Sequence, residues 1–197
     1  MSVMSHLGFR STAIGVGVVG LLAGAVATAP QGLAVSTGPR EAAAVTTLKF
    51  TRNHGDPLNS RLAVVRGGKT VAVFRAGSGL GADHPQGRNE CAREKGWLPA
   101  GTYAVGARTT RYNGSVIKGY AIPLSDKTCE NGRTPRTELF IHSEMTRDGG
   151  RGKPEGQRWD GVNDYKSAGC VKLSPQDIKK LFRVLGQGSA PKRLTVR

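Results

Sequence analysis

Cys170 and His142 are the two residues of this 197-residue chain whose side chains and positions together suit nucleophilic catalysis. Cys170 follows Gly169 in the stretch SAGCVKL, and the chain contains only three cysteines. A thiol reacts as a nucleophile once a nearby base or cation stabilises its thiolate form. His142 ends the apolar run Leu-Phe-Ile, which makes a rigid position for an imidazole base. Together the two residues indicate a thiol nucleophile with its base.

The backbone before Cys170 also suits such chemistry. Gly169 permits a close backbone approach or an unusual dihedral angle, and N–H groups at such a turn can face the oxyanion of an acyl-transfer reaction. The alternatives are structural. A lone cysteine can pack as a small hydrophobic residue, and a histidine at a strand end, such as His142, is often a surface residue. The combined pattern, rather than either residue alone, favours catalysis.

The N-terminal segment has the composition of a secretory signal peptide. Arg10 precedes an uncharged, mostly apolar run over 11–29, and A-x-A-like cleavage sites lie at 25–27 and 32–34. A retained membrane anchor is the alternative, because the run is barely long enough to cross a bilayer. We therefore expect a signal peptide at 1–29, a linker or disordered arm at 30–46, and an exported domain at 47–197, either secreted or associated with the cell wall.

Lysine and arginine outnumber aspartate and glutamate by 29 to 14, which gives a formal net charge of +15. Such an excess attracts polyanions. Export argues against nucleic acid and favours anionic cell-wall polymers as partners. Contact with a membrane is expected only through the leader, if it stays uncleaved.

Three cysteines allow three different pairings in an oxidising compartment. Cys91 and Cys129 lie in polar, charged loops where a covalent link is useful, whereas Cys170 has Gly169 before it and Val171 after it. These neighbourhoods favour a Cys91–Cys129 disulfide and a free thiol at Cys170.

The pattern along the chain predicts a mainly β domain with one clear C-terminal helix and a long glycine-rich loop. Gly67-Gly68 between two β-rich runs is a hairpin signal. Ser174 is a helix N-cap, Pro175 suits the first helical position, and apolar residues follow at helical spacing. We expect strands at 62–65, 70–74, from 102, within 115–124, within 137–145 and within 192–197, the helix at 175–186, and the loop at 147–166.

Beyond these elements, the chain resembles a known family. FIHSEMT, the glycine-rich loop and SAGCVKL together resemble the His…Ser-x-Gly-Cys signature of L,D-transpeptidase catalytic domains, which have the YkuD-type fold. LAVVRGGKTVAVFRAGSG is similar to the opening hairpin of that family, and LPAGTY to its Pro-x-Gly-x-aromatic turn. The resemblance spans about 62–185 and implies a β-sandwich. Papain-like and NlpC-type peptidases place cysteine before histidine, which is the opposite order.

The resemblance implies roles for individual residues. Cys170 would be the nucleophile, and His142 its base and ion-pair partner. The backbone carbonyl of Ser143 would orient the imidazole ring. Gly169 and Cys170 would supply oxyanion-hole amides, and Ser167 would shape the turn.

Four further residues are candidates for substrate binding. Arg136 could receive a substrate carboxylate, although a surface arginine is an equal alternative. Tyr165 and Trp159 could line the cleft, with core packing as their alternative. Lys172 stands where arginine is common in the family and keeps the positive charge without the bidentate fork. Ala168 stands where many members have histidine or arginine, as in an SAGC variant of the motif.

The resemblance implies a secreted cysteine acyltransferase that acts on peptidoglycan stem peptides. The thiolate would attack the carbonyl after an L-centre and release the terminal D-amino acid; an amine acceptor then gives an L,D-type cross-link. The alternatives are a hydrolase on the same fold, meaning a carboxypeptidase, an endopeptidase or an antagonistic effector, and a non-catalytic cell-wall-binding module. We expect no cofactor and no metal, since the sequence has no metal-ligand cluster, phosphate loop or paired-carboxylate signature.

Overall fold

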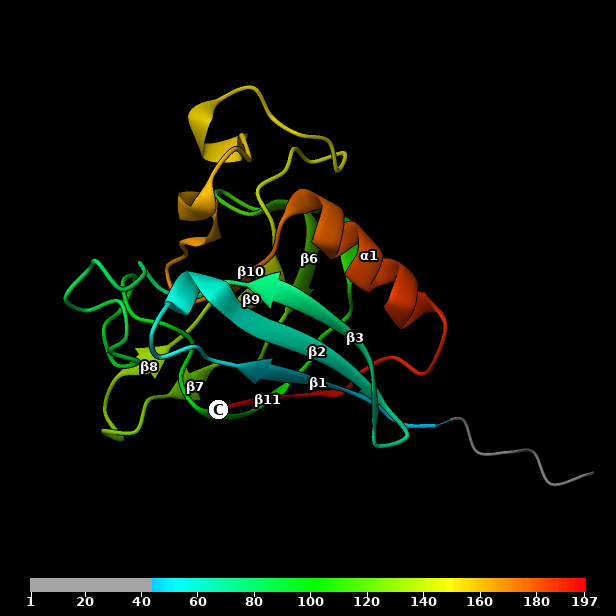
Figure 1. The fold of residues 1–197 in the computed structure, drawn as a ribbon, viewed down its shortest axis with the longest axis horizontal. Coiled ribbons are helices and arrows are strands. Elements are labelled where there is room, and N and C mark those ends of the chain that lie inside the picture. Colours follow the sequence, from blue (N-terminus) through cyan, green and yellow to red (C-terminus); the bar gives the residue numbers. More distant parts are fainter. Residues whose placement is uncertain (1–43) are drawn as a thin grey trace, which may run out of the picture. The chain divides into compact units, whose positions relative to one another are not determined.

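The computed structural model describes residues 44–197, which contain eleven short strands and one α-helix (Figure 1). The prediction of a mainly β fold with one C-terminal helix is therefore confirmed for this part of the chain. The predicted signal peptide at 1–29 lies outside the described residues, as does the predicted arm up to residue 43. Strand β1 begins at Thr46, the last residue of that arm.

The larger sheet has five strands. Its order is β3-β2-β1-β11-β4, and only β1 and β11 pair in parallel. The predicted Gly-Gly turn joins β2 to β3, and both glycines have positive φ, 55° and 78°, as tight hairpin turns require. The strands are β1 (Thr46–Thr51), β2 (Ser60–Arg66), β3 (Lys69–Ala76), β4 (Gly101–Ala104) and β11 (Arg193–Val196).

The smaller sheet has four strands in the order β10-β9-β6-β5, with β9 and β10 in parallel. An isolated bridge between Gly77 and Lys172 connects the end of β3 to β10, so β10 is held on both sides. A separate two-stranded ribbon pairs β7 with β8. The strands are β5 (Thr109–Asn113), β6 (Lys118–Pro123), β7 (Lys127–Thr128), β8 (Pro135–Arg136), β9 (Phe140–His142) and β10 (Val171–Lys172).

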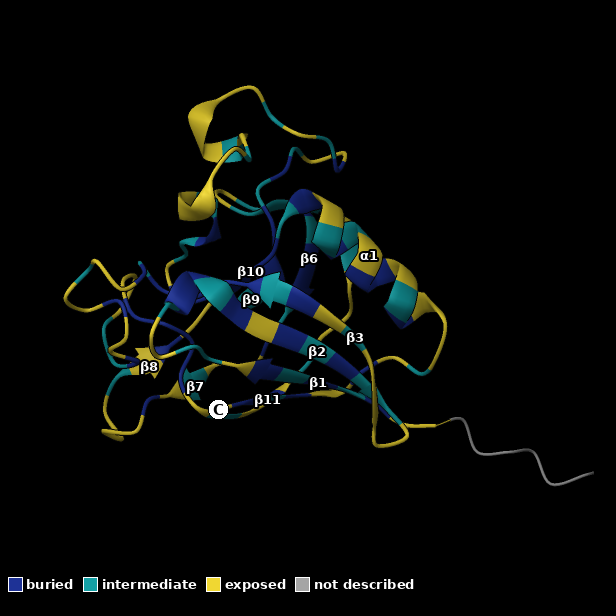
Figure 2. Cartoon of the chain, in the orientation of Figure 1, coloured by how far each residue is buried: buried dark blue, intermediate teal, exposed yellow. Residues whose placement is uncertain are grey.

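Helix α1 (Pro175–Gly186) lies against β3 and buries one apolar face, whereas its outer face is exposed (Figure 2). Ser174 Oγ accepts a hydrogen bond from the N–H of Asp177 at 3.1 Å, which caps the first turn. At the other end, Arg66 donates to Val184 O at 2.8 Å, so a cation stabilises the negative end of the helix dipole. Ile178, Leu181, Phe182 and Leu185 join a single core with residues of both sheets.

The predicted long loop is present between β9 and β10. Only two 3-10 turns interrupt it, η2 (Glu155–Gln157) and η3 (Val162–Tyr165), and most of its residues are exposed (Figure 2). The rings of Trp159 and Tyr165 meet edge to face at 4.8 Å near its end. Within residues 44–197, no helix has the length and apolar character that crossing a membrane requires.

Candidate active site

The two chemically reactive side chains come from neighbouring parallel strands. The register pairs Val171 with Ile141 and Lys172 with His142. Cys170, directly before β10, therefore stands across from Phe140, two positions from His142. Since side chains alternate with a period of two, Cys170 and His142 project from the same face. Both line one cavity of about 870 Å³.

The thiol of Cys170 is buried. Its Sγ donates to the carbonyl oxygen of Glu138 at 3.6 Å, and no hydrogen bond joins it to His142 in the described chain. Burial raises the pKa of the thiol to about 11, although a backbone hydrogen bond from Phe140 and the cations Arg136 and Lys172 act in the opposite direction. Glu138 adopts φ 53°, an uncommon backbone conformation for a residue with a side chain.

The imidazole of His142 is also buried. Its Nδ1 lies 3.3 Å from the carbonyl oxygen of Ser143, the contact that the sequence resemblance implies. When Nδ1 carries the proton and donates it to this carbonyl, Nε2 is left as the basic nitrogen. Burial, reinforced by the neighbouring cation Lys172, lowers the pKa of His142 to about 3, against the effect of the Ser143 contact.

These shifts bear on one expectation. The resemblance implies an ion pair of thiolate and imidazolium, but burial disfavours both charged forms. In this structure burial therefore favours a thiol beside a neutral imidazole. A neutral imidazole is the form that can accept a proton, so the arrangement still suits a general base that acts during the attack.

The turn before Cys170 is fixed by hydroxyl groups. Ser167 Oγ donates to Cys170 O at 2.7 Å and accepts a hydrogen bond from Gly169 N at 3.3 Å. Of the two amides predicted for the oxyanion hole, the N–H of Gly169 therefore already donates to Ser167. The N–H of Cys170 has no hydrogen-bond acceptor within residues 44–197. Ser78, which the sequence did not single out, donates to Gly169 O at 3.4 Å and accepts from Leu98 N at 2.8 Å.

Lys172 lines the cavity and forms a buried ion pair with Glu144. Its Nζ also donates to Lys166 O at 2.9 Å. Glu144 was missed in the sequence, because it follows the end of β9 and no local pattern indicates its partner. Its second carboxylate oxygen has no partner among the described residues, and burial raises the pKa of this carboxyl although Lys172 opposes the shift.

Arg136, predicted to receive a substrate carboxylate, is instead occupied by the protein backbone. Its side chain is buried, and its two terminal nitrogens donate to the carbonyl oxygens of Glu90, Trp97, Gly96 and Ala168.

Tyr165 and Trp159 do not line the cavity that contains Cys170. They border a second cavity of about 330 Å³ together with Arg75, whose guanidinium lies 4.4 Å from the centre of the Tyr165 ring. Tyr165 is buried. The structure therefore favours packing for Tyr165, and the expected role in the cleft is corrected for both aromatic residues.

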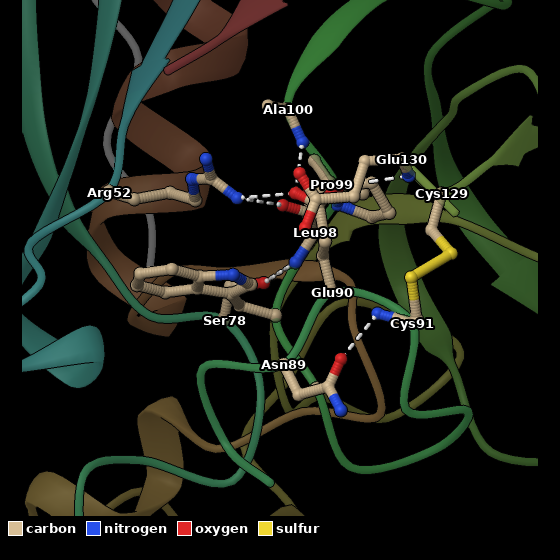
Figure 3. A network of polar contacts seen from close by, with 12 residues as sticks. Arg52, Ser78, Asn89, Glu90, Cys91, Leu98, Pro99, Ala100, Cys129 and Glu130 are labelled. Carbon is tan, nitrogen blue, oxygen red and sulfur yellow. Dashed lines mark hydrogen bonds and ion pairs between the residues drawn. A yellow bond between two sulfur atoms is a disulfide. The ribbon is translucent and has the colours of Figure 1, made fainter. Parts of the chain in front are cut away.

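The predicted disulfide is present beside the cavity. Cys91 and Cys129 are joined, with their Cα atoms 5.4 Å apart. The adjacent carboxylate of Glu90 accepts hydrogen bonds from Arg52, at 2.9 Å, and from two backbone amides, those of Ala100 and Glu130 (Figure 3). Burial raises the pKa of Glu90, but these hydrogen bonds outweigh it and the pKa is lowered. The loop that contains Glu90 and Cys91 is thus held in place by a disulfide and by the hydrogen bonds of a buried carboxylate.

In the described part of the chain, no group of three or more His, Cys, Asp or Glu side chains comes together in a way that could hold a metal ion.

Comparison with protein families gives one match. The model of the L,D-transpeptidase catalytic domain, YkuD, matches residues 56–196. The comparison with curated proteins gives no match.

Three solved structures are similar in fold. Bd1075 of Bdellovibrio bacteriovorus has 13% sequence identity and a TM-score of 0.49, covering 81% of this chain and 50% of its own. The helical cell shape determining protein Pgp2 of Campylobacter jejuni has 15% identity and a TM-score of 0.48, covering 79% and 50%. L,D-transpeptidase 1 of Mycobacterium tuberculosis has 13% identity and a TM-score of 0.41, covering 77% and 62%. The chain thus spans about half the length of the first two.

Proposed function

The chain belongs to the L,D-transpeptidase catalytic domain family, and we propose that it is an exported cysteine acyltransferase that acts on peptidoglycan stem peptides. The observation that carries this proposal is the placement of Cys170 and His142 on one face of neighbouring strands, in the wall of one cavity. A non-catalytic wall-binding module would not require a thiol and a neutral base in that arrangement.

In the proposed reaction, His142 Nε2 removes the thiol proton as Cys170 Sγ attacks the stem-peptide carbonyl. A carbon–sulfur bond forms, and the N–H of Cys170 donates to the oxyanion. Collapse breaks the carbon–nitrogen bond, and the leaving D-amino acid takes the proton from His142. An acceptor amine then attacks the thioester and forms a new carbon–nitrogen bond while His142 accepts its proton. The carbon–sulfur bond breaks, and the leaving sulfur takes that proton from His142, which restores the thiol.

Two further features support action outside the cytoplasm. A disulfide between Cys91 and Cys129 is stable in an oxidising compartment. The net charge of +15 favours retention by anionic cell-wall polymers. We accordingly propose that the signal peptide at 1–29 is removed and that the domain at 47–197 acts in the cell wall.

Incubation of the purified domain with tetrapeptide stems tests the function. A cross-linked dimer supports acyl transfer to an amine, whereas tripeptide alone supports a hydrolase on the same fold. Cys170→Ala and His142→Asn should each abolish either product, and His84→Asn, a histidine outside the cavity, should not. Binding of the stem peptide with neither product would refute the enzyme proposal and leave a wall-binding module.

A further inference from the structure

Arg136 is a buried cation that no carboxylate neutralises. It is 3% exposed, and it belongs to none of the ion pairs found in residues 44–197. Burial lowers the pKa of its guanidinium, while interactions with Tyr103, Cys170 and Glu90 raise it. A buried charge without an ion-pair partner costs several kcal/mol unless hydrogen bonds offset it. The hydrogen bonds of Arg136 therefore decide what this charge does in the structure.

The hydrogen bonds of Arg136 connect two segments that are distant in sequence. One is the disulfide-linked loop at 77–100, between β3 and β4, which contains Cys91. The carbonyls of Glu90, Gly96 and Trp97 in this loop accept hydrogen bonds from Arg136. The other is the turn before the nucleophile, which offers Ala168 O. A single nitrogen, Nη2, donates to Gly96 O at 3.1 Å and to Ala168 O at 3.2 Å. The guanidinium is thus one direct link between that loop and the turn. Ser78, which bonds Leu98 N and Gly169 O, is another.

This link contributes to the orientation of the peptide between Ala168 and Gly169. Because Ala168 O points to Arg136, the N–H of the same trans peptide, that of Gly169, points away from it, towards Ser167 Oγ. Gly169 has φ 116°, and a Cβ added there would overlap Nη2 of Arg136. The glycine of SAGC is therefore required by the guanidinium as well as by the backbone.

The charge of Arg136 also acts on the thiol. Burial raises the pKa of Cys170, and Arg136 is one of the groups that oppose this, together with a backbone hydrogen bond from Phe140 and the cation Lys172. Glu138 raises the pKa of the thiol. Arg93, Glu94 and Lys166 are further charged residues that line the same cavity.

We propose that Arg136 is a positioning residue, which orients the turn that carries Cys170 by binding it to the disulfide-linked loop and places a positive charge beside the thiol. This inference rests on the proposed function of Cys170 as the nucleophile. It differs from direct substrate binding because both terminal nitrogens of Arg136 donate to protein carbonyls, although the residue also lines the cavity.

Two substitutions separate the effect of the positive charge from the effect of the hydrogen bonds. Arg136→Met removes the charge and the hydrogen bonds. Arg136→Lys keeps the charge but lacks the planar set of donors that bonds both segments. Arg133, exposed on the same β7–β8 hairpin, provides the matched control Arg133→Met. Cys170 is the only free cysteine, so alkylation by iodoacetamide reports on it alone. The rate is measured against pH with the disulfide intact, at temperatures where thermal unfolding shows each variant to be folded.

We expect Arg136→Met to move the alkylation profile to higher pH and to slow the reaction at pH 8 on the order of tenfold, the change that one pKa unit produces. Arg136→Lys should show the alkylation profile of the wild type. Its Cys170 should be acylated by a carbapenem-type acylator roughly tenfold more slowly than in the wild type, which corresponds to an increase in activation free energy of about 1.4 kcal/mol. If Arg136→Met does not fold, Arg136→Lys alone carries the test.

Two results would overturn the inference. One is an acylation rate of Arg136→Lys equal to that of the wild type; the other is a pH dependence of alkylation that is the same for Arg136→Met and Arg133→Met. Failure of the proposed function looks different: the wild type then forms no product from tetrapeptide stems. The alkylation profiles report on Arg136 in either case, because they require no substrate.

Discussion

Replacement of Gly169 by alanine is the sharpest test of the geometry around the nucleophile. Two costs can be worked from the structure. The φ of 116° is unfavourable for a residue with a Cβ by about 1–2 kcal/mol. The methyl group would also displace the guanidinium of Arg136, and each charged hydrogen bond lost, to Gly96 O and to Ala168 O, contributes roughly 1.5 kcal/mol or more.

Together these terms predict that Gly169→Ala lowers the free energy of unfolding by about 4 kcal/mol. For a domain of this size, such a loss corresponds to a decrease in melting temperature of roughly 8–16 °C. The assay is urea denaturation followed by circular dichroism, with thermal unfolding as a second measurement. The matched control is Gly132→Ala: Gly132 has φ 68° and no atom within 4 Å of an added Cβ, so it isolates the backbone cost of about 1–2 kcal/mol.

A double-mutant cycle with Arg136→Ala tests the cause. Without the guanidinium the overlap disappears, so the double variant should be more stable than the sum of the single losses predicts, by about 2 kcal/mol. Equal losses for Gly169→Ala and Gly132→Ala, or strict additivity in the cycle, would refute the argument that Arg136 excludes a side chain at this position.

Three further predictions concern the disulfide and the titrating groups. Replacement of Cys91 and Cys129 by alanine should lower the free energy of unfolding by about 2–4 kcal/mol and slow acylation of Cys170; unchanged acylation in the folded variant would separate the loop from the site. Lys172→Met should raise the pKa of His142, because a nearby cation is removed; NMR titration of the imidazole measures it, and a lowered pKa contradicts the electrostatic account. Acidification from pH 6 to pH 4 should destabilise the wild type more than His142→Asn, by at most about 1.4 kcal/mol per pH unit, since unfolded histidine binds a proton near its ordinary pKa and the buried imidazole does not; equal slopes in urea denaturation at each pH would contradict this.

Local elements were predictable because their signals are local. The helical period, its cap at Ser174 and the Gly67-Gly68 turn each depend on neighbouring residues, and α1 and the β2–β3 hairpin follow them. The juxtaposition of Cys170 with His142 was predictable only through a family resemblance, because the two residues are separated by the long loop.

The environment of these groups was not predictable from the sequence. The partners of Arg136 are backbone carbonyls, which every residue possesses, so no pattern of side chains indicates them. The position of Tyr165 was also not predictable, because adjacent residues of an irregular loop can face different cavities. Lys166 lines the cavity that contains Cys170, whereas Tyr165 lines the second cavity. Burial of His142, which disfavours the expected ion pair, depends on the packing of the whole site.

The neutral resting pair and the disulfide fit one another chemically. Thiol–disulfide exchange requires a thiolate, and burial raises the pKa of the Cys170 thiol well above neutral pH, so the thiolate is disfavoured. Burial therefore protects the Cys91–Cys129 link from the one free thiol of the chain. The same burial leaves Cys170 dependent on His142 for ionisation, so the thiol becomes strongly nucleophilic only when an acyl group in the cavity accepts the electron pair as the proton leaves.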